Sequence, residues 1–98
     1  MYMLFQEVKR ILSKHRKDLY RLGVKTLALF GSVARNEQSR KSDVDILIDF
    51  DTKKGLFEFI DTKNYLEDLL GCEVDLVTKN ALHPALKGKI LREAKRVF

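Results

Sequence analysis

Residues 30–50, which read FGSVARNEQSRKSDVDILIDF, decide the fold. The apolar run at 26–30 ends at Gly31, and a short apolar run beside a glycine indicates a buried strand. Residues 43–50 alternate between aspartates and large apolar side chains, apart from one leucine, which indicates a second strand with one apolar face. Between them we predict a short helix over about 32–37 and a polar loop.

The segments outside this stretch extend the pattern. Apolar residues at helical spacing predict one helix over about 3–22 and another over 56–70, followed by Gly71 at the C′ position. Residues 73–77 indicate a third strand. A last helix is predicted from Pro84 to the C-terminus, with Leu86, Ile90, Ala94 and Val97 facing inward.

The order of these elements predicts a single α/β domain over residues 1–98. Its sheet is expected to be small and mixed, with three strands or slightly more, and about four helices pack on it. The length of 98 residues allows one compact domain with one core.

Composition narrows the class of protein. The single cysteine, Cys72, excludes a disulfide framework, and no signal peptide or apolar run of about 20 residues is present. We therefore expect a cytoplasmic protein without membrane contact. The net charge of +5 favours polyanionic partners without choosing among them. A nucleic-acid partner is disfavoured, because the chain lacks a row of stacking aromatics or a known reader motif. The predicted last helix is basic, which indicates a solvated face or, as an alternative, a surface for an acidic or nucleic-acid partner.

The first chemical feature is Gly31-Ser32 at a junction between strand and helix. Glycine lets a phosphate approach the backbone closely, and the Ser32 hydroxyl adds a hydrogen-bond donor. Arg35 lies one turn further on and can pair with phosphate oxygens. The alternative is an ordinary turn, because Gly-Ser is common in turns.

The second feature is the pair Asp43 and Asp45, two residues apart at the start of a strand. Residues at i and i+2 point to the same side, so both carboxylates converge. A divalent cation removes their repulsion, and Mg²⁺ prefers hard oxygen ligands. In the alternative interpretation both side chains face solvent beside Arg40 and Lys41.

The third feature is Asp75, in the middle of the apolar strand 73–77. A lone carboxylate in a core strand costs several kcal/mol unless it is paired or binds a metal. If this strand lies beside the strand 43–50, three carboxylates meet at one edge of the sheet. That arrangement suits two-metal nucleotidyl chemistry, in which the ions lie roughly 3.5–4 Å apart.

Taken together, Gly31-Ser32, ten further residues and Asp43-Val44-Asp45 resemble the signature of the DNA polymerase beta-like nucleotidyltransferase superfamily, and its minimal nucleotidyltransferase branch most closely. Asp75 stands where that family carries its third acidic residue. The resemblance spans about residues 25–78. One departure is Asn36, where many members carry glycine, and asparagine tolerates the left-handed backbone that such a turn needs.

The resemblance implies how the site residues divide their work. Asp43 and Asp45 would be catalytic ligands of two Mg²⁺ ions, and Asp75 would bind only the ion on the acceptor side. The triphosphate of ATP or a related donor would be held by Gly31, Ser32 and Arg35. An acceptor hydroxyl would attack the α-phosphorus, and its proton would pass to Asp75 or leave without a dedicated base.

The resemblance also implies a partner. HEPN toxins are the usual genomic partners of minimal nucleotidyltransferases, so the resemblance implies an antitoxin that adenylylates a tyrosine of such a toxin and forms a hetero-oligomer with it. The alternative is a non-catalytic nucleotide-binding antitoxin that neutralises the toxin by contact. Arg10 and His15 share the Arg-x-x-x-x-His spacing of HEPN ribonucleases, but they lie in an ordinary amphipathic helix, and we interpret the match as chance.

Overall fold

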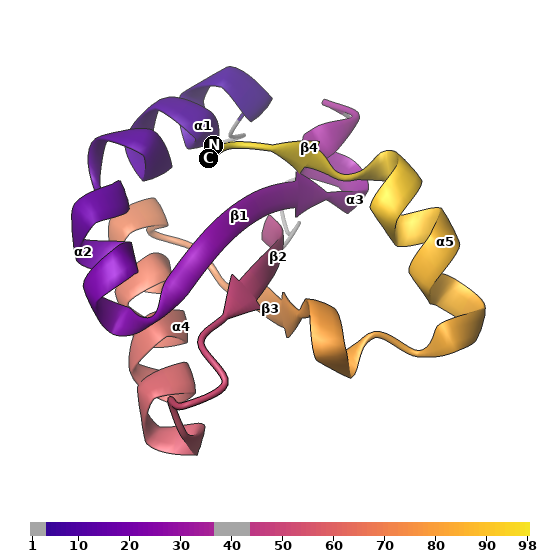
Figure 1. The fold of residues 1–98 in the computed structure, drawn as a ribbon. Coiled ribbons are helices and arrows are strands. Elements are labelled where there is room, and N and C mark those ends of the chain that lie inside the picture. The colour runs from indigo at the N-terminus through magenta and orange to yellow at the C-terminus, as the bar shows by residue number, and fades with distance from the viewer. Residues whose placement is uncertain (1–3, 37–43) are drawn as a thin grey trace.

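The computed structural model describes residues 4–36 and 44–98 (Figure 1). In chain order its elements are α1 (Phe5–Lys14), α2 (Arg16–Leu22), β1 (Val24–Phe30), α3 (Gly31–Ala34), β2 (Val44–Phe50), α4 (Leu56–Leu70), β3 (Val74–Thr78), the 3-10 helix η1 (Lys79–Ala81), α5 (Pro84–Glu93) and β4 (Lys95–Arg96). The predicted α/β class is confirmed. The predicted helix over 56–70 is also confirmed, and Gly71 ends it in the left-handed conformation.

The strands form one mixed sheet in the order β3-β2-β1-β4. Strand β1 runs antiparallel to both β2 and β4, whereas β2 and β3 are parallel. A parallel pair needs a crossover connection, and α4 provides it. The sheet predicted with three strands or slightly more therefore has four in the described part of the chain, and the fourth is only two residues long.

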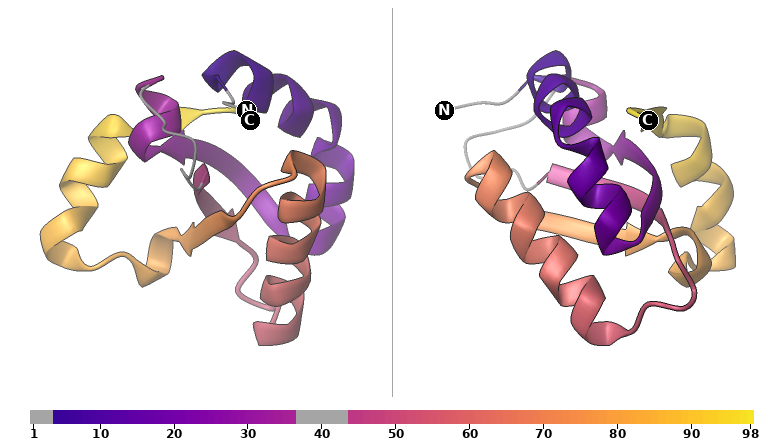
Figure 2. Two further views of the ribbon diagram at one scale, coloured as in Figure 1. Left: turned by 180° about the vertical axis from the view of Figure 1, so that it is seen from behind. Right: turned by 60° about the vertical axis from the view of Figure 1, so that its left-hand side comes forward.

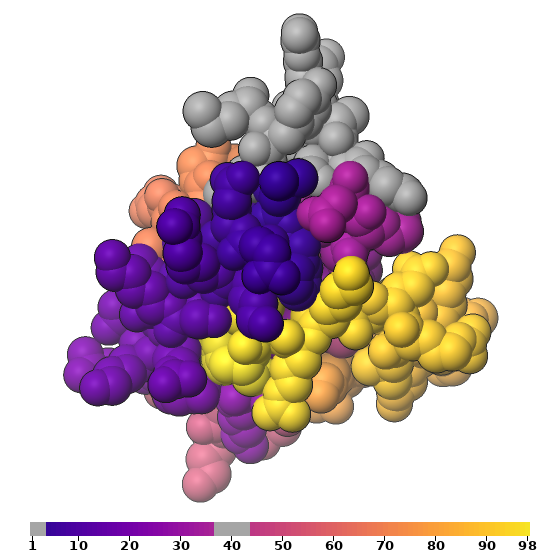
Figure 3. Space-filling view, turned by 90° about the horizontal axis from the view of Figure 1, so that it is seen from above, coloured from indigo at the N-terminus to yellow at the C-terminus, as the bar shows by residue number. Residues whose placement is uncertain are grey.

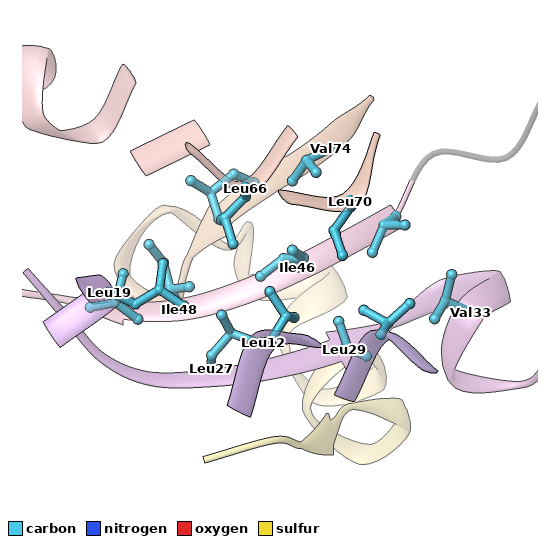
Figure 4. Close-up of a cluster of buried hydrophobic side chains, with 14 of the residues drawn as sticks. Leu12, Leu19, Leu27, Leu29, Val33, Ile46, Ile48, Leu66, Leu70 and Val74 are labelled. Carbon is cyan, nitrogen blue, oxygen red and sulfur yellow. The ribbon is translucent and has the colours of Figure 1, made fainter. Parts of the chain in front are cut away.

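One face of the sheet carries the hydrophobic core. Val44, Ile46 and Ile48 of β2 are buried, as their alternation predicted. Helices α1, α2 and α4 cover this face (Figure 2). Figure 4 shows the fully buried Leu12 of α1 and Leu66 of α4 among the apolar side chains of the strands. The core thus holds β1, β2 and β3 in place from one side.

The other face of the sheet is covered more sparsely. Helix α5 lies on this side (Figure 2) and has no buried residue. Leu47 is the one leucine that the alternation of residues 43–50 places on the same side as the aspartates, and it is buried on this outer face. Towards the start of β2 and β3 the outer face presents Asp45 and Asp75, which are half-buried and exposed respectively.

The prediction of one continuous N-terminal helix is wrong, because the helix breaks at His15. The imidazole Nδ1 of His15 lies 2.9 Å from the carbonyl oxygen of Ile11, the acceptor that the His15 amide would use in an α-helix. That amide bonds instead to Leu12 O at 3.1 Å. A side chain that competes for the backbone acceptor thus separates α1 from α2.

The prediction that the last helix reaches the C-terminus is also wrong. Helix α5 ends at Glu93, and Ala94 is extended, with φ −66° and ψ 133°. Lys95 and Arg96 then pair with β1, and residues 97 and 98 hydrogen-bond to the backbone of Leu27. Pairing satisfies the backbone groups along the edge of β1, which a continued helix would leave open.

Of the four side chains predicted to face inward from that helix, Leu86 is 54% exposed, whereas Val97 does pack against the core. Figure 3 shows the C-terminal segment beside α1, and there Lys95 Nζ lies 5.2 Å from the ring centre of Phe5. Among the described residues, no helix combines the length and the apolar character needed to cross a membrane.

Candidate functional site

The end of β1 and the beginnings of β2 and β3 meet at one edge of the sheet. Phe30 pairs with Asp45, and Asp45 pairs with Asp75 on the parallel neighbour. Paired residues on adjacent strands lie about 5 Å apart and point to the same face. The condition set by the sequence, that the strand of Asp75 lies beside the strand of Asp45, is therefore met. Asp43 lies outside the described residues.

The surroundings of Asp75 differ from the prediction. It was expected in a core strand, but β3 is an edge strand and the Asp75 side chain is exposed on its outer face. Val74 and Leu76, its neighbours in sequence, face the core instead. No burial cost has to be offset at this position, so the carboxylate is stable in water without a metal.

Gly31 is fitted to the carboxylate of Asp45. Its φ is +68°, in the left-handed region that side chains other than glycine rarely adopt. A Cβ atom built on Gly31 would overlap Asp45 Oδ2 and lie 3.1 Å from Asp45 Cγ. The Asp45 carboxylate therefore lies directly against the backbone of the turn, and glycine is needed here for two independent reasons.

Ser32 and Arg35 follow Gly31 on the short helix α3 and its C-cap. Ser32 is half-buried. The Arg35 guanidinium forms an ion pair with Glu93 at the end of α5, with 3.5 Å between Nη1 and Oε2. The two side chains are 47% and 36% exposed. An ion pair this exposed contributes about 0–1 kcal/mol, so a phosphate could replace Glu93 at little cost. Sequence reasoning missed Glu93, because nothing in the pattern links positions 35 and 93.

Asn36 confirms the tolerance expected of asparagine at this position, since its φ is +54°. Asn36 also forms a hydrogen bond that the sequence did not indicate. Its side-chain Oδ1 accepts a hydrogen bond of 2.9 Å from the backbone N–H of Phe5, the first residue of α1. The turn after α3 is thereby tied to the start of α1, and a glycine at position 36 would lose this bond.

The donor set of this edge fits a hard divalent cation. Asp45 and Asp75 present two carboxylates from neighbouring strands, and oxygen ligands of this kind are what Mg²⁺ binds. Within residues 4–36 and 44–98, no three His, Cys, Asp or Glu side chains are grouped closely enough to hold a metal. Asp43, the third carboxylate expected beside Asp45, is not among those residues.

Comparison with known proteins gives this arrangement a family context. Residues 9–97 match the model of the family described as nucleotidyltransferase domain. Protein adenylyltransferase MntA of Thermococcus cleftensis is 44% identical over 92 residues, which cover 93% of each chain.

Two solved structures show the same fold. One, described as the structure of a "putative minimal nucleotidyltransferase", superposes with a TM-score of 0.84 and 34% identity, over 96% of each chain. Another is a chain from the complex of a tri-AMPylated Shewanella oneidensis HEPN toxin with its MNT antitoxin. It has a TM-score of 0.68 and 20% identity, and the match covers 97% of this chain and 72% of that one.

Proposed function

Because this chain belongs to the nucleotidyltransferase domain family, we propose that it transfers AMP from ATP to a tyrosine hydroxyl of a partner HEPN toxin and acts as that toxin's antitoxin. The observation that carries the proposal is the in-register pair Asp45 and Asp75 beside the turn at Gly31. The relative named protein adenylyltransferase supports the reaction, and the complex that contains an AMPylated HEPN toxin supports the acceptor. We also propose a cytoplasmic location, because the reaction would use ATP and because a single cysteine cannot form a disulfide within the chain.

In this proposal the carboxylates hold the metal. Asp43 and Asp45 would bind two Mg²⁺ ions, and Asp75 would bind only the ion nearest the acceptor. Bound Mg²⁺ supplies neutralisation of the phosphate charge and a lower pKa for the acceptor hydroxyl. The exposure of Asp75 on an edge strand supports the acceptor-side role, because the acceptor is a macromolecule that must approach from solvent.

The turn would hold the triphosphate. Gly31 has no side chain between its backbone and the phosphates, Ser32 offers a hydroxyl, and Arg35 would exchange Glu93 for a phosphate oxygen. The bond between the tyrosine oxygen and the α-phosphorus then forms as the bond to the β-phosphate oxygen breaks, and pyrophosphate leaves. The tyrosine proton passes to Asp75 or directly to solvent.

The test is transfer itself. The chain is co-expressed with its HEPN partner, incubated with ATP and Mg²⁺, and the partner is followed by intact-mass spectrometry. We expect one or more added AMP groups with the wild type. With Asp45→Asn we expect transfer at least about a hundredfold slower, because the variant lacks a ligand of the Mg²⁺ that would neutralise the phosphate charge.

A partner that binds the wild-type chain but gains no nucleotide from any of the four nucleoside triphosphates would disprove transfer. It would favour the alternative antitoxin, which binds nucleotide without catalysis and neutralises the toxin by contact.

A further inference from the structure

A pocket lies between the sheet and α5, separate from the turn at Gly31. Its volume is about 170 Å³. The sheet contributes Thr26, Ala28 and Leu47 to its lining, and the end of α5 contributes Leu91 and Ala94. These strand residues lie on the outer face, opposite the core, on the side where Figure 2 shows α5.

The pocket and the two aspartates share this face. Ala28 pairs with Leu47, and two residues further towards the edge Phe30 pairs with Asp45. Two residues of a strand span about 7 Å. If the phosphate of a nucleotide lies at Asp45, the base, which is joined to that phosphate through one sugar, can therefore reach Leu47.

The size of the pocket suits a single flat ring system. A protein cavity of roughly 150 Å³ with an apolar lining binds benzene, so about 170 Å³ has room for a base but not for a whole nucleotide. The lining also includes Lys79 and Arg96. Both donate hydrogen bonds, and a guanidinium stacks well on a π-face.

We propose that this pocket is the subsite for the adenine base of the donor nucleotide, with the triphosphate directed towards Gly31 and the aspartates. This inference rests on the proposed function. It adds that the pocket is the place where the protein selects the base of the donor nucleotide. Leu47 and Ala28 form the floor under the ring. Lys79 and Arg96 face its acceptor nitrogens, and Leu91 and Ala94 close the side that α5 provides.

The first experiment compares two ligands on the wild-type chain by calorimetry: ATP and inorganic tripolyphosphate, each with Mg²⁺. We expect ATP to bind at least about tenfold more tightly, as buried stacking of one base generally provides. Equal affinities would overturn the base subsite and leave the proposed function standing. Binding of neither ligand would overturn the proposed function and this inference with it.

The second experiment places a large side chain in the pocket by substitution of Ala94, the extended residue that directly follows α5. Ala94→Phe should weaken Mg-ATP binding by about tenfold and leave tripolyphosphate within about twofold. Leu91→Ala should weaken Mg-ATP by a few-fold, and because Leu91 is 42% exposed the chain should still fold. Leu86→Phe is the matched control, since Leu86 lies on the same helix and is 54% exposed, and it should change neither affinity. Unchanged ATP binding in folded Ala94→Phe, or an equal loss of both ligands, would overturn the proposal.

Discussion

Gly31 and Gly71 share a backbone conformation but not their surroundings. Their φ angles are +68° and +66°. A Cβ on Gly31 would meet the Asp45 carboxylate, whereas a Cβ on Gly71 would have nothing within 4 Å. A side chain at Gly71 would therefore meet only the strain of the left-handed backbone, whereas a side chain at Gly31 would also clash with Asp45.

We predict different results for alanine at these glycines. Gly71→Ala should cost about 1–2 kcal/mol of unfolding free energy from the left-handed backbone alone and leave Mg-ATP binding intact. Gly31→Ala should cost at least as much and also displace Asp45, so that Mg-ATP affinity falls by about tenfold or more. Thermal melting and calorimetry on both variants measure these effects. Equal Mg-ATP affinity of Gly31→Ala and Gly71→Ala would show that nucleotide binding does not depend on the position of Asp45 beside Gly31.

At the scale of the elements, one side-chain contact ties α2 to α4. The Tyr65 hydroxyl of α4 donates a hydrogen bond of 2.9 Å to Asp18 Oδ2 of α2. Partial burial, together with the bond to Asp18 and its negative charge, raises the pKa of Tyr65 above its ordinary value. His15, at the break between α1 and α2, contributes an edge-on ring contact to Tyr65 at 6.5 Å between centres.

This contact predicts a dependence of stability on alkaline pH. The native chain holds the Tyr65 proton more tightly than the unfolded chain, whose tyrosine pKa is about 10. Between that value and the higher native pKa, the native state binds more protons, so the free energy of unfolding falls as pH rises. The stabilisation is complete below about pH 9, begins to fall near pH 10 and is lost as the pH rises through the raised native pKa. The melting temperature of the wild type should therefore fall more steeply from pH 9 to 11 than that of Tyr65→Phe. Parallel curves for the two proteins would rule out this contribution.

At the scale of the whole molecule, ligand binding to the native state should appear in the melting temperature. A ligand at a hundredfold excess over its dissociation constant stabilises the native state by about 2.7 kcal/mol. For a domain of this size each 1 kcal/mol moves the melting temperature by roughly 4–8 °C. Mg-ATP at that excess should thus raise it by on the order of ten degrees, clearly more than ATP with chelator.

Variants divide this response between the carboxylates. Asp75→Asn should keep most of the Mg-ATP shift while transfer is lost, because Asp75 is proposed to bind only the acceptor-side ion. Asp45→Asn should lose both the shift and transfer. If Asp75→Asn abolishes the shift as fully as Asp45→Asn does, the proposed division of the metal ligands is wrong. If the melting temperature of the wild type does not change as Mg-ATP is added, the proposed metal site is wrong.

The sequence by itself determined most of the helices and strands, and it proposed the residues of the candidate site. Alternation in 43–50, the glycine at 71 and the joint motif at Gly31 and Asp45 depend on local backbone preferences and on spacing along the chain, both of which can be read without a fold. The α/β class, the helix over 56–70 and the family all followed from these signals.

Only the tertiary structure decided how segments far apart in sequence meet. The pairing of Asp45 with Asp75, the ion pair from Arg35 to Glu93 and the return of the C-terminus onto β1 depend on strand order. The same strand order leaves Asp75 exposed, where its apolar neighbours had suggested burial. The break at His15 is local instead, because its Nδ1 contacts the carbonyl oxygen four residues earlier, and apolar spacing alone does not reveal that contact. The pocket under α5 does depend on the tertiary structure, because space between packed elements arises only once the chain is folded.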